Sequence, residues 1–254
     1  MIKKFLYDFY FYKKKIGLTQ TIKYFLKKFI REKNNIKIFF KNNKYYIRPH
    51  ENDLKVIILN LGNEYDFLKD TNLSENQLII DAGAYIGTSS IRFSQLFKEN
   101  KIIAIEPFKE NYDLMLKNIK NYNNITPINS ALVPSNYADD IFLYKSKTGA
   151  WGNNILKDTY DDRNLDIIDK VNKIDLKSIL QQYKKKISIL KLDIEGSEKM
   201  IFENDKDILN DINIIIVELH RKINQDIEEV FFSFAKDRLN FSLGVDKIVS
   251  VKKA

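Results

Sequence analysis

The chain has no cysteine and only two histidines among its 254 residues. The absence of cysteine excludes disulfides, a thiolate nucleophile and thiolate metal sites, and two histidines leave little scope for a histidine-rich zinc centre. Long apolar runs are absent too, since no stretch approaches the roughly 18 residues of a membrane span and the N-terminus lacks the apolar core of a signal peptide. We therefore expect a cytoplasmic protein.

Acidic residues are scarce in one segment, which explains the net charge of +8. Residues 1–33 contain ten lysines and arginines but only Asp8 and Glu32. One interpretation is a helix packed on its own domain or on a second subunit of a homo-oligomer. The other is a peripheral contact of residues 1–31 with the anionic inner face of a membrane. No recognition motif for nucleic acid accompanies the basic residues, so we expect no such partner. The apolar stripe at helical spacing consists of Ile22, Phe25, Leu26, Phe29 and Ile30.

The length predicts one large domain, residues 75–254, with a helical and hairpin extension, residues 1–74. Residues 36–49 alternate like a hairpin with Asn42-Asn43 as the turn, and residues 53–68 read as a helix-rich connector. Beyond them, apolar runs alternate with helical patterns, which predicts an α/β fold with a doubly wound sheet. The expected strands are residues 78–81, 102–106, 125–128, 141–144, 187–192 and 214–219, and the expected helices include residues 88–97 and 197–204.

Glycine is also scarce, and two of the eight glycines follow the expected strand at residues 78–81. They form the pattern D-x-G-x-x-x-G with Asp81, Gly83 and Gly87, whereas a dinucleotide turn requires G-x-G-x-x-G. The pattern therefore favours S-adenosylmethionine (SAM) over a dinucleotide. We expect Gly83 to permit the turn and Gly87 to let the amino-acid half of SAM approach the helix. Asp81 could accept hydrogen bonds from the ammonium group of SAM, directly or through water, and Ala84 and Tyr85 complete the turn.

Further groups for the nucleoside follow later strands. Glu106, before Pro107, ends the strand at residues 102–106 and could accept hydrogen bonds from both ribose hydroxyls. Residues 129–131 follow the strand at residues 125–128, where a side-chain or backbone oxygen could meet the amino group of adenine. An ordinary turn is the alternative for this second segment, which consists of Asn129, Ser130 and Ala131.

These motifs, in this order, resemble the FkbM family of SAM-dependent methyltransferases from about residue 46 to residue 219. The resemblance implies a Rossmann-like fold with a mostly parallel seven-stranded sheet, and O-methylation, frequently of a hydroxyl on a sugar or secondary metabolite. Tyr85 departs from the family, which usually has Asn there, and the first 35 residues lie outside the match. The motifs are Ile47-Arg48-Pro49, Asp53, residues 62–65, residues 81–87, Ile105-Glu106-Pro107, Asn111, residues 129–132, residues 191–198 and residues 217–220.

Methyl transfer to a hydroxyl requires the acceptor oxygen to be oriented and its proton removed by a base or a metal. His220, after the strand at residues 214–219, is our first choice as general base because imidazole titrates near neutrality. Asp193 is the competitor, as a base of raised pKa or as the group that orients the acceptor. Asp193, Glu195 and Glu218 could instead bind Mg²⁺, which we do not favour because Gly196 should end the strand that would align the first two.

Four residues are candidates for acceptor contact. Trp151, the only tryptophan, lies in a polar, glycine-flanked loop and could stack on a sugar or anchor the loop. The resemblance places Arg48 and Asp53 before the catalytic core and so implies that they face the acceptor, and Glu218 is a further candidate. With the function that the resemblance implies, we expect an O-methyltransferase acting on a sugar hydroxyl of a glycan or a similar polyhydroxylated metabolite. The alternative is a non-catalytic methyltransferase-fold protein that binds a membrane or a partner through its basic N-terminus.

Overall fold

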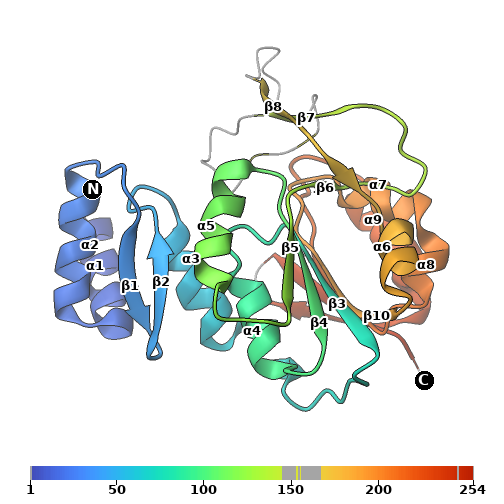
Figure 1. Cartoon of the computed structure of the whole chain (residues 1–254), viewed down its shortest axis with the longest axis horizontal. Coiled ribbons are helices and arrows are strands. Elements are labelled where there is room, and N and C mark those ends of the chain that lie inside the picture. The colour runs from blue at the N-terminus through green and yellow to red at the C-terminus, as the bar shows by residue number, and fades with distance from the viewer. Residues whose placement is uncertain (1, 145–152, 154, 156–166, 245, 254) are drawn as a thin grey trace.

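A mostly parallel seven-stranded sheet forms the centre of the molecule (Figure 1). The computed structural model describes residues 2–144, 153, 155, 167–244 and 246–253. Five strands are parallel, and β13 lies between β11 and β12 and is antiparallel to both. The α/β class and the doubly wound sheet are therefore confirmed. From one edge to the other the strands are β12 (Leu239–Leu243), β13 (Lys247–Val251), β11 (Ile214–Glu218), β10 (Lys186–Leu192), β3 (Gln77–Ala82), β4 (Lys101–Ile105) and β5 (Ile125–Ile128).

Helices cover both faces of the sheet because the central strands are apolar on both sides. Along β3, Ile79 points into one core, while Leu78 and Ile80 point into the other. The Ile79 face carries α4 (Thr88–Leu96) and α5 (Lys109–Ile119). The opposite face carries α6 (Leu176–Tyr183), α7 (Glu198–Asn204), α8 (Lys206–Asn210) and α9 (Ile227–Phe234).

The N-terminal extension packs on the α4 and α5 side. Its Tyr65 is fully buried against Phe93 of α4, with ring centroids 4.9 Å apart. One hydrophobic core thus crosses the boundary predicted between residues 74 and 75. The extension consists of α1 (Ile2–Ile16), α2 (Leu18–Phe29), β1 (Ile36–Phe40), β2 (Asn43–Ile47), α3 (Asp53–Leu59), a π-helical turn (Asn60–Glu64) and a 3₁₀ turn (Asp66–Leu68).

The predicted hairpin is confirmed, but its turn is shifted by one residue. Lys41 and Asn42 have φ values of +46° and +64°, as the two central residues of a tight hairpin turn require, and Asn43 already begins β2. Asn42 tolerates this backbone conformation well, whereas Asn43 is needed in the ladder opposite Phe40.

Besides the β1–β2 hairpin, two further small sheets lie outside the main one in the described part of the chain. The predicted strand at residues 141–144 is β7 (Ile141–Tyr144), which pairs with β8 (Ile167–Val171) and not with the central sheet. In the other, β6 (Ala131–Leu132) pairs with β9 (Lys173–Ile174). Figure 1 shows β7 and β8 at the top of the view and the helical hairpin of α1 and α2 at one extremity of the molecule. Among the described residues, no helix is long and apolar enough to cross a membrane.

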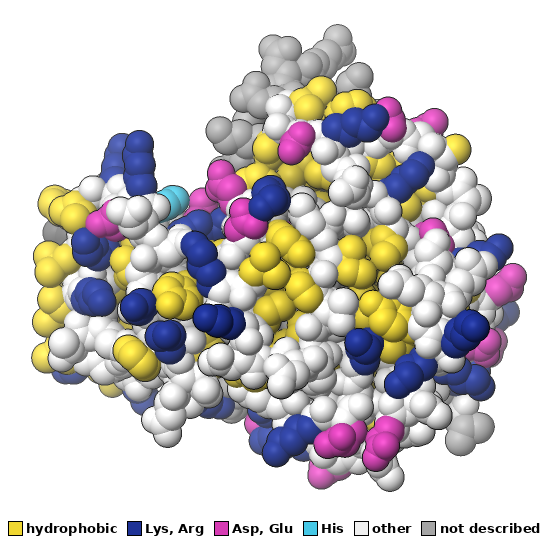
Figure 2. Space-filling view, viewed as in Figure 1, with side chains coloured by type: hydrophobic (Ala, Val, Ile, Leu, Met, Phe, Trp, Pro, Cys, Tyr) yellow, Lys and Arg dark blue, Asp and Glu magenta, His cyan; other side chains and the backbone are white. Residues whose placement is uncertain are grey.

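Hydrophobic and basic side chains are intermixed over the end of the molecule that α1 and α2 form (Figure 2). Leu26 and Phe29, two members of the predicted apolar stripe, are exposed, whereas Phe25 is partly buried among the rings of Phe5, Phe9 and Tyr24. The extension therefore covers only part of the stripe, and packing on its own domain does not explain the rest.

Candidate functional site

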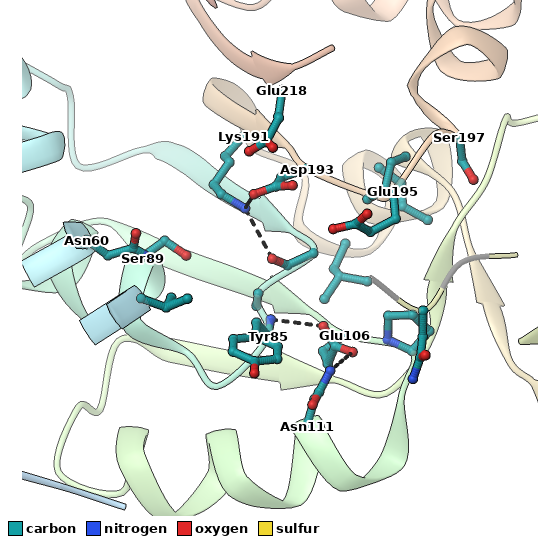
Figure 3. Close-up of a pocket in the computed structure, with 18 of the residues that line it drawn as sticks. Asn60, Tyr85, Ser89, Glu106, Asn111, Lys191, Asp193, Glu195, Ser197 and Glu218 are labelled. Atoms are coloured by element: carbon teal, nitrogen blue, oxygen red, sulfur yellow. Dashed lines mark hydrogen bonds and ion pairs between the residues drawn. The ribbon is translucent and has the colours of Figure 1, made fainter. Parts of the chain in front are cut away.

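A cavity of about 320 Å³ opens where the parallel strands β3, β4, β10 and β11 end (Figure 3). The carboxyl ends of parallel strands are where α/β sheets bind ligands. The turn after β3 and the segment after β4 form one wall, and the segment after β10 forms the opposite one. Of the predicted site residues, the cavity is lined by Gly83, Ala84, Tyr85, Glu106, Pro107, Ala131, Asp193, Glu195 and Glu218.

Gly83 allows two turns to touch. Its φ is +78°, and a β-carbon at this position would lie 1.7 Å from the backbone oxygen of Asp193. The turn after β3 therefore rests directly on the chain that leaves β10, which a side chain would prevent. The requirement for glycine that the motif predicted is explained by this contact.

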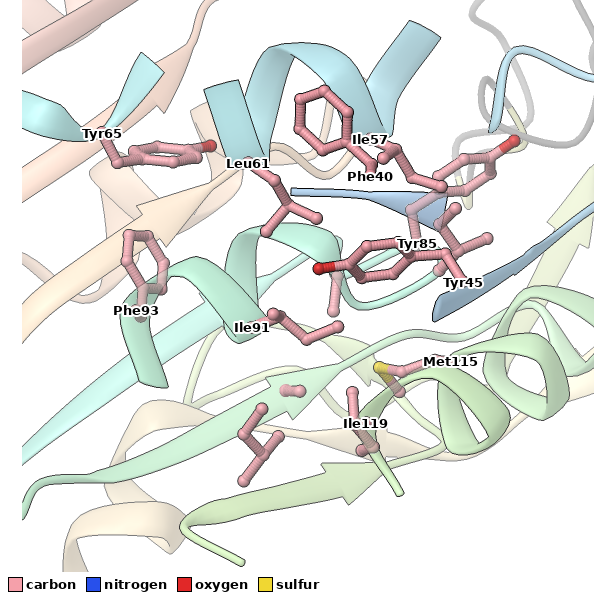
Figure 4. Packing of buried hydrophobic residues seen from close by; sticks show 14 of the residues in the cluster. Phe40, Tyr45, Ile57, Leu61, Tyr65, Tyr85, Ile91, Phe93, Met115 and Ile119 are labelled. Atoms are coloured by element: carbon pink, nitrogen blue, oxygen red, sulfur yellow. The ribbon is translucent and has the colours of Figure 1, made fainter. Parts of the chain in front are cut away.

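Gly87 has a different role from the predicted one. It has a φ of +85° at the start of α4, but it does not line the cavity. A β-carbon there would lie 2.8 Å from Ile119 and 2.9 Å from Met115, both on α5 (Figure 4). Gly87 thus allows α4 and α5 to pack closely, and the expected approach of a ligand to its backbone is not supported.

Tyr85, where the family usually has Asn, also adopts a left-handed conformation, with a φ of +52°. Asn tolerates this region better than Tyr, so other contacts must hold the side chain in place. The Tyr85 hydroxyl donates a hydrogen bond to Asp53, and the Arg48 guanidinium lies 5.3 Å from the centre of the ring. The substitution is therefore accommodated by two residues of the extension.

Glu106 is nearly fully buried at the cavity wall. Its Oε2 accepts a hydrogen bond from the Tyr85 backbone N–H at 2.9 Å, and its Oε1 accepts from Phe108 N–H at 3.0 Å and from Asn111 Nδ2 at 3.1 Å. Burial raises the pKa of Glu106 to about 7, although these hydrogen bonds oppose the shift.

A chain of polar contacts joins Glu106 to the extension. Arg48 donates to both oxygens of Asp53 at 3.0 Å, and its Nη1 donates to Asn111 Oδ1 at 2.8 Å. Asn111 then donates to Glu106, so its amide group connects the ion pair to the cavity acid. Arg48 itself is buried and does not line the cavity. The structure places it behind Glu106, away from where an acceptor could contact it.

Lys191 was not among the predicted site residues, although it stands at the end of β10 in the cavity wall. Its ammonium group lies 3.2 Å from Asp81 Oδ1 and 3.3 Å from Asp193 Oδ2, and it donates to the Gly83 carbonyl at 3.1 Å. Burial lowers the pKa of Lys191, but Asp193 and Asp81 raise it by more than burial lowers it. The net shift is upward, and the ammonium group is charged. From the sequence, a single lysine in an apolar strand is expected to be exposed. The only signal for a buried, paired lysine was that acids follow it at Asp193 and Glu195.

Asp81 is fully buried and does not line the cavity. Ser89 and Ser90 donate to its Oδ2 at 2.5 and 2.6 Å, and Lys191 faces Oδ1. The carboxylate is thus occupied by three groups of the protein. Asp81 positions Lys191 and the start of α4. In this arrangement the ammonium group of SAM could not reach the Asp81 carboxylate directly, as one of the predictions required.

Asp193 and Glu195 line the cavity together but differ in protonation. Burial raises the pKa of Asp193, but Lys191, Lys247 and His220 outweigh burial, so the pKa lies below its usual range and not above it, as a base of raised pKa would require. Burial also raises the pKa of Glu195, which reaches about 8 because Asp193 and other acids add to the effect while His220 opposes it. At neutral pH Asp193 is therefore ionised and Glu195 is mostly protonated.

His220 lies behind Glu195 and does not line the cavity. Its Nδ1 is 3.0 Å from Glu198 Oε1, and its Nε2 is 3.4 Å from Glu195 Oε2 and 3.9 Å from Glu218 Oε1. Burial lowers the pKa of His220, but the hydrogen bond that its Nδ1 donates to Glu198 and the charges of the surrounding acids raise the pKa to about 10. An imidazole that is already protonated at neutral pH does not suit the predicted role of general base.

Three ligand atoms could coordinate a metal ion. One atom each from Asp193, Glu195 and His220 lie within 4.8 Å of one another. The set differs from the predicted one in that His220 replaces Glu218, whose Oε2 is 3.4 Å from Lys247. Lys191 and Lys247 already supply positive charge to this cluster, which reduces the need for a cation.

The remaining predicted residues occupy varied places. Asn129 donates from Nδ2 to the carbonyls of Glu106 and Pro107, at 2.8 and 2.9 Å, and so holds the segment after β4 against the segment after β5. Ser130 is buried, and Ala131 begins β6 at the cavity wall. Their contact with adenine stays a prediction. Trp151 lies outside the described residues.

Residues 81–242 match the methyltransferase FkbM domain, which covers well over half of the chain. The protein belongs to the FkbM methyltransferase family. The resemblance drawn from the motifs is thus confirmed. The matched FkbM region begins at Asp81 and includes both cavity walls, and it ends inside β12. No curated protein matches the sequence.

Several solved structures are similar to this chain at low sequence identity. An FkbM methyltransferase from Methylobacillus flagellatus is 16% identical with a TM-score of 0.47, over 72% of this chain and 45% of that one. TYW2 from M. jannaschii, crystallised with AdoMet, is 13% identical with a TM-score of 0.46, over 87% and 86% of the two chains. A putative rRNA methylase from Clostridium thermocellum is 11% identical with a TM-score of 0.45, over 77% and 96%. The chain thus spans less than half the length of the M. flagellatus protein.

We expect Gly83→Ala to be strongly destabilising. The new methyl group would clash with the Asp193 carbonyl and the positive φ would be strained, so the loss should be about 2–5 kcal/mol. The matched control is Gly62→Ala, because Gly62 has free space around it and no positive φ. The control should change stability by less than about 0.5 kcal/mol or increase it slightly. Thermal unfolding of both variants measures the difference, and equal melting temperatures would contradict the close contact.

Proposed function

We propose that the protein is a SAM-dependent O-methyltransferase whose acceptor is a hydroxyl of a sugar or similar polyhydroxylated compound. The observation that carries the proposal is the pairing of Glu106 on one cavity wall with an ionised Asp193 on the other. The first suits a ribose and the second suits an alcohol that must lose its proton. Membership of the FkbM family supports the same reaction.

The residues of the cavity fit SAM. Glu106 Oε2 has one protein donor, so it retains capacity to accept from a ribose hydroxyl. The described lining contains five acids, Glu106, Asp193, Glu195, Glu218 and Asp246, against three lysines, Lys55, Lys191 and Lys247. When bound, SAM supplies a methyl group on sulfur together with a good leaving group.

Asp193 is the group best placed to receive the proton of the acceptor hydroxyl. It is ionised, lines the cavity and is held by Lys191, which remains charged throughout. The hydroxyl would donate a hydrogen bond to Asp193, which orients the oxygen and accepts the proton as the new carbon–oxygen bond forms. Under this proposal Asp193 takes the role first predicted for His220, and His220 keeps Glu195 in position through the contact between Nε2 and Oε2.

The same wall supports a polyhydroxylated acceptor. Asp193, Glu195 and Glu218 offer several carboxyl oxygens, which can accept hydrogen bonds from neighbouring hydroxyls of one sugar. A nucleobase acceptor would instead call for an aromatic stacking platform. Tyr85 is the one aromatic residue among the described lining residues, and its hydroxyl is already bonded to Asp53.

The affinity for S-adenosylhomocysteine should depend on pH through Glu106. Below its pKa of about 7 the carboxyl is protonated and accepts fewer hydrogen bonds, so affinity should fall with pH. At pH 6 the loss should approach tenfold relative to pH 8, because only the ionised fraction is competent. Isothermal titration calorimetry at several pH values measures this. Glu106→Gln should bind about 10- to 100-fold more weakly at pH 8 and show a flat profile. Unchanged affinity in a folded variant would remove Glu106 from the site.

Asp193→Asn should reduce the turnover of methyl transfer by about 10²–10⁴-fold while leaving the affinity for S-adenosylhomocysteine within a few-fold. His220→Gln should affect turnover far less, because His220 does not line the cavity. Incorporation of labelled methyl from SAM into a panel of glycosides and glycan fragments measures both. The opposite ranking would return the role of base to His220. No transfer to any acceptor by the unmodified protein, despite tight donor binding, would favour a non-catalytic role.

Methyl transfer should persist in the presence of EDTA, since lysines already compensate the charge of the carboxylate cluster. The same assay, with and without the chelator and with added Mg²⁺, provides the measurement. Loss of activity with EDTA and its recovery with Mg²⁺ would instead make Asp193, Glu195 and His220 the ligands of a catalytic metal.

A further inference from the structure

The two N-terminal helices expose an unusual amount of apolar surface. Nine of their large hydrophobic side chains are exposed, and Phe29 reaches 87%. Scattered exposed hydrophobics are ordinary, but a contiguous group on one element indicates an interaction surface. We call this group the N-terminal surface. It consists of Phe5, Leu6, Tyr7 and Tyr10 of α1 and Leu18, Ile22, Leu26, Phe29 and Ile30 of α2 and its end.

Helix α2 is apolar on two faces that serve different purposes. Thr21 and Tyr24 point inward and are almost fully buried. Leu18, Ile22, Leu26 and Phe29 follow one another at intervals of four, four and three residues, so they form a stripe along the outer side. The inner face already attaches the helix to its domain. The outer stripe is therefore not needed for folding.

Exposed basic residues lie on the same two helices as this stripe. They include Lys3 and Lys4 of α1 and Lys23 of α2, whereas Lys28 contacts Tyr24 on the inner face of α2. Of the two acids in residues 1–33, Glu32 is paired with Lys27 at 2.7 Å, which leaves the excess of positive charge intact. An apolar stripe flanked by lysines matches the chemistry of an anionic lipid surface. Figure 2 shows the two kinds of side chain interleaved.

We propose that α1 and α2 dock the protein on the surface of an anionic lipid bilayer. The outer stripe enters the boundary between headgroups and acyl chains, and the lysines contact lipid phosphates. The helices, of 15 and 12 residues, lie on the bilayer and do not cross it. A second copy of the chain fits less well, because a symmetric contact would bring two strongly basic segments together.

Vesicle sedimentation with the full-length protein tests the proposal without any assay of methyl transfer, so its outcome is separate from that of the proposed function. We expect binding to vesicles that contain phosphatidylglycerol, weaker binding to pure phosphatidylcholine, and release at high salt. Protein that stays in the supernatant with the anionic vesicles at low salt would overturn the proposal. The proposal would also be overturned if the protein bound equally to both kinds of vesicle and if salt did not change this binding.

Matched variants locate the contact. Leu26→Ser should reduce binding to the anionic vesicles, whereas Leu239→Ser, at a side chain of nearly equal exposure on β12, should not; the two exposed fractions are 59% and 58%. Lys23→Gln should weaken binding about fivefold, whereas Lys236→Gln, outside the surface, should have no effect. Equal effects within either pair would contradict the assignment. Sedimentation velocity would reveal the alternative, a dimer that Leu26→Ser dissociates without any binding to vesicles.

Discussion

A buried ammonium group organises the site. Lys191 is almost inaccessible to solvent, and a charge in that position is tolerated only if it is paired and hydrogen-bonded. Asp81 and Asp193 supply the charges, and the Gly83 carbonyl accepts a hydrogen bond. These three partners come from the ends of two neighbouring strands. The lysine therefore draws the turn after β3 and the segment after β10 together, which also explains why Gly83 must lack a side chain.

The wall that holds Glu106 depends on the extension in the same manner. Arg48 and Asp53 lie before the core of the fold, yet their contacts continue through Asn111 to the cavity acid. Tyr85 joins the same group through Asp53, in a backbone conformation that favours Asn. The extension thus supports the turn after β3 from behind. Arg48 and Asp53, which were expected to face the acceptor, instead support the cavity wall that contains Glu106.

The fold was predictable because its central strands are apolar on both sides and are separated by helical patterns. Residues 125–128, for example, form a strand with the predicted bounds. The hairpin of β12 and β13 was missed because Leu239 and Phe241 of β12 are exposed and interrupted by polar residues. The pattern of apolar and polar residues along β12 does not indicate a strand, because this edge strand is held in place by its pairing with β13.

The candidate site was predictable in its positions but less so in its roles. Asp81, Glu106 and Asp193 were singled out because each follows an apolar run at the end of a strand. Glu106 and Asp193 line the cavity, whereas Asp81 is buried beside Lys191. The role of Gly87 was misjudged because the sequence does not show that Met115 and Ile119 occupy the space beside it. His220 was preferred as base on its ordinary pKa, whereas Glu198 and Glu195, which follow β10 and not β11, raise the pKa of the imidazole in the folded chain.

Opposite protonation of adjacent acids is what makes the second wall suited to chemistry. Asp193 and Glu195 are two residues apart and face the same cavity, but Lys191 lies beside the first and not the second. Desolvation therefore dominates at Glu195 and raises its pKa, whereas the lysine lowers that of Asp193. One carboxyl group can then accept a proton at neutral pH while its neighbour can donate a hydrogen bond. Two acids whose environments separate their pKa values in this way are able to serve different roles in one reaction.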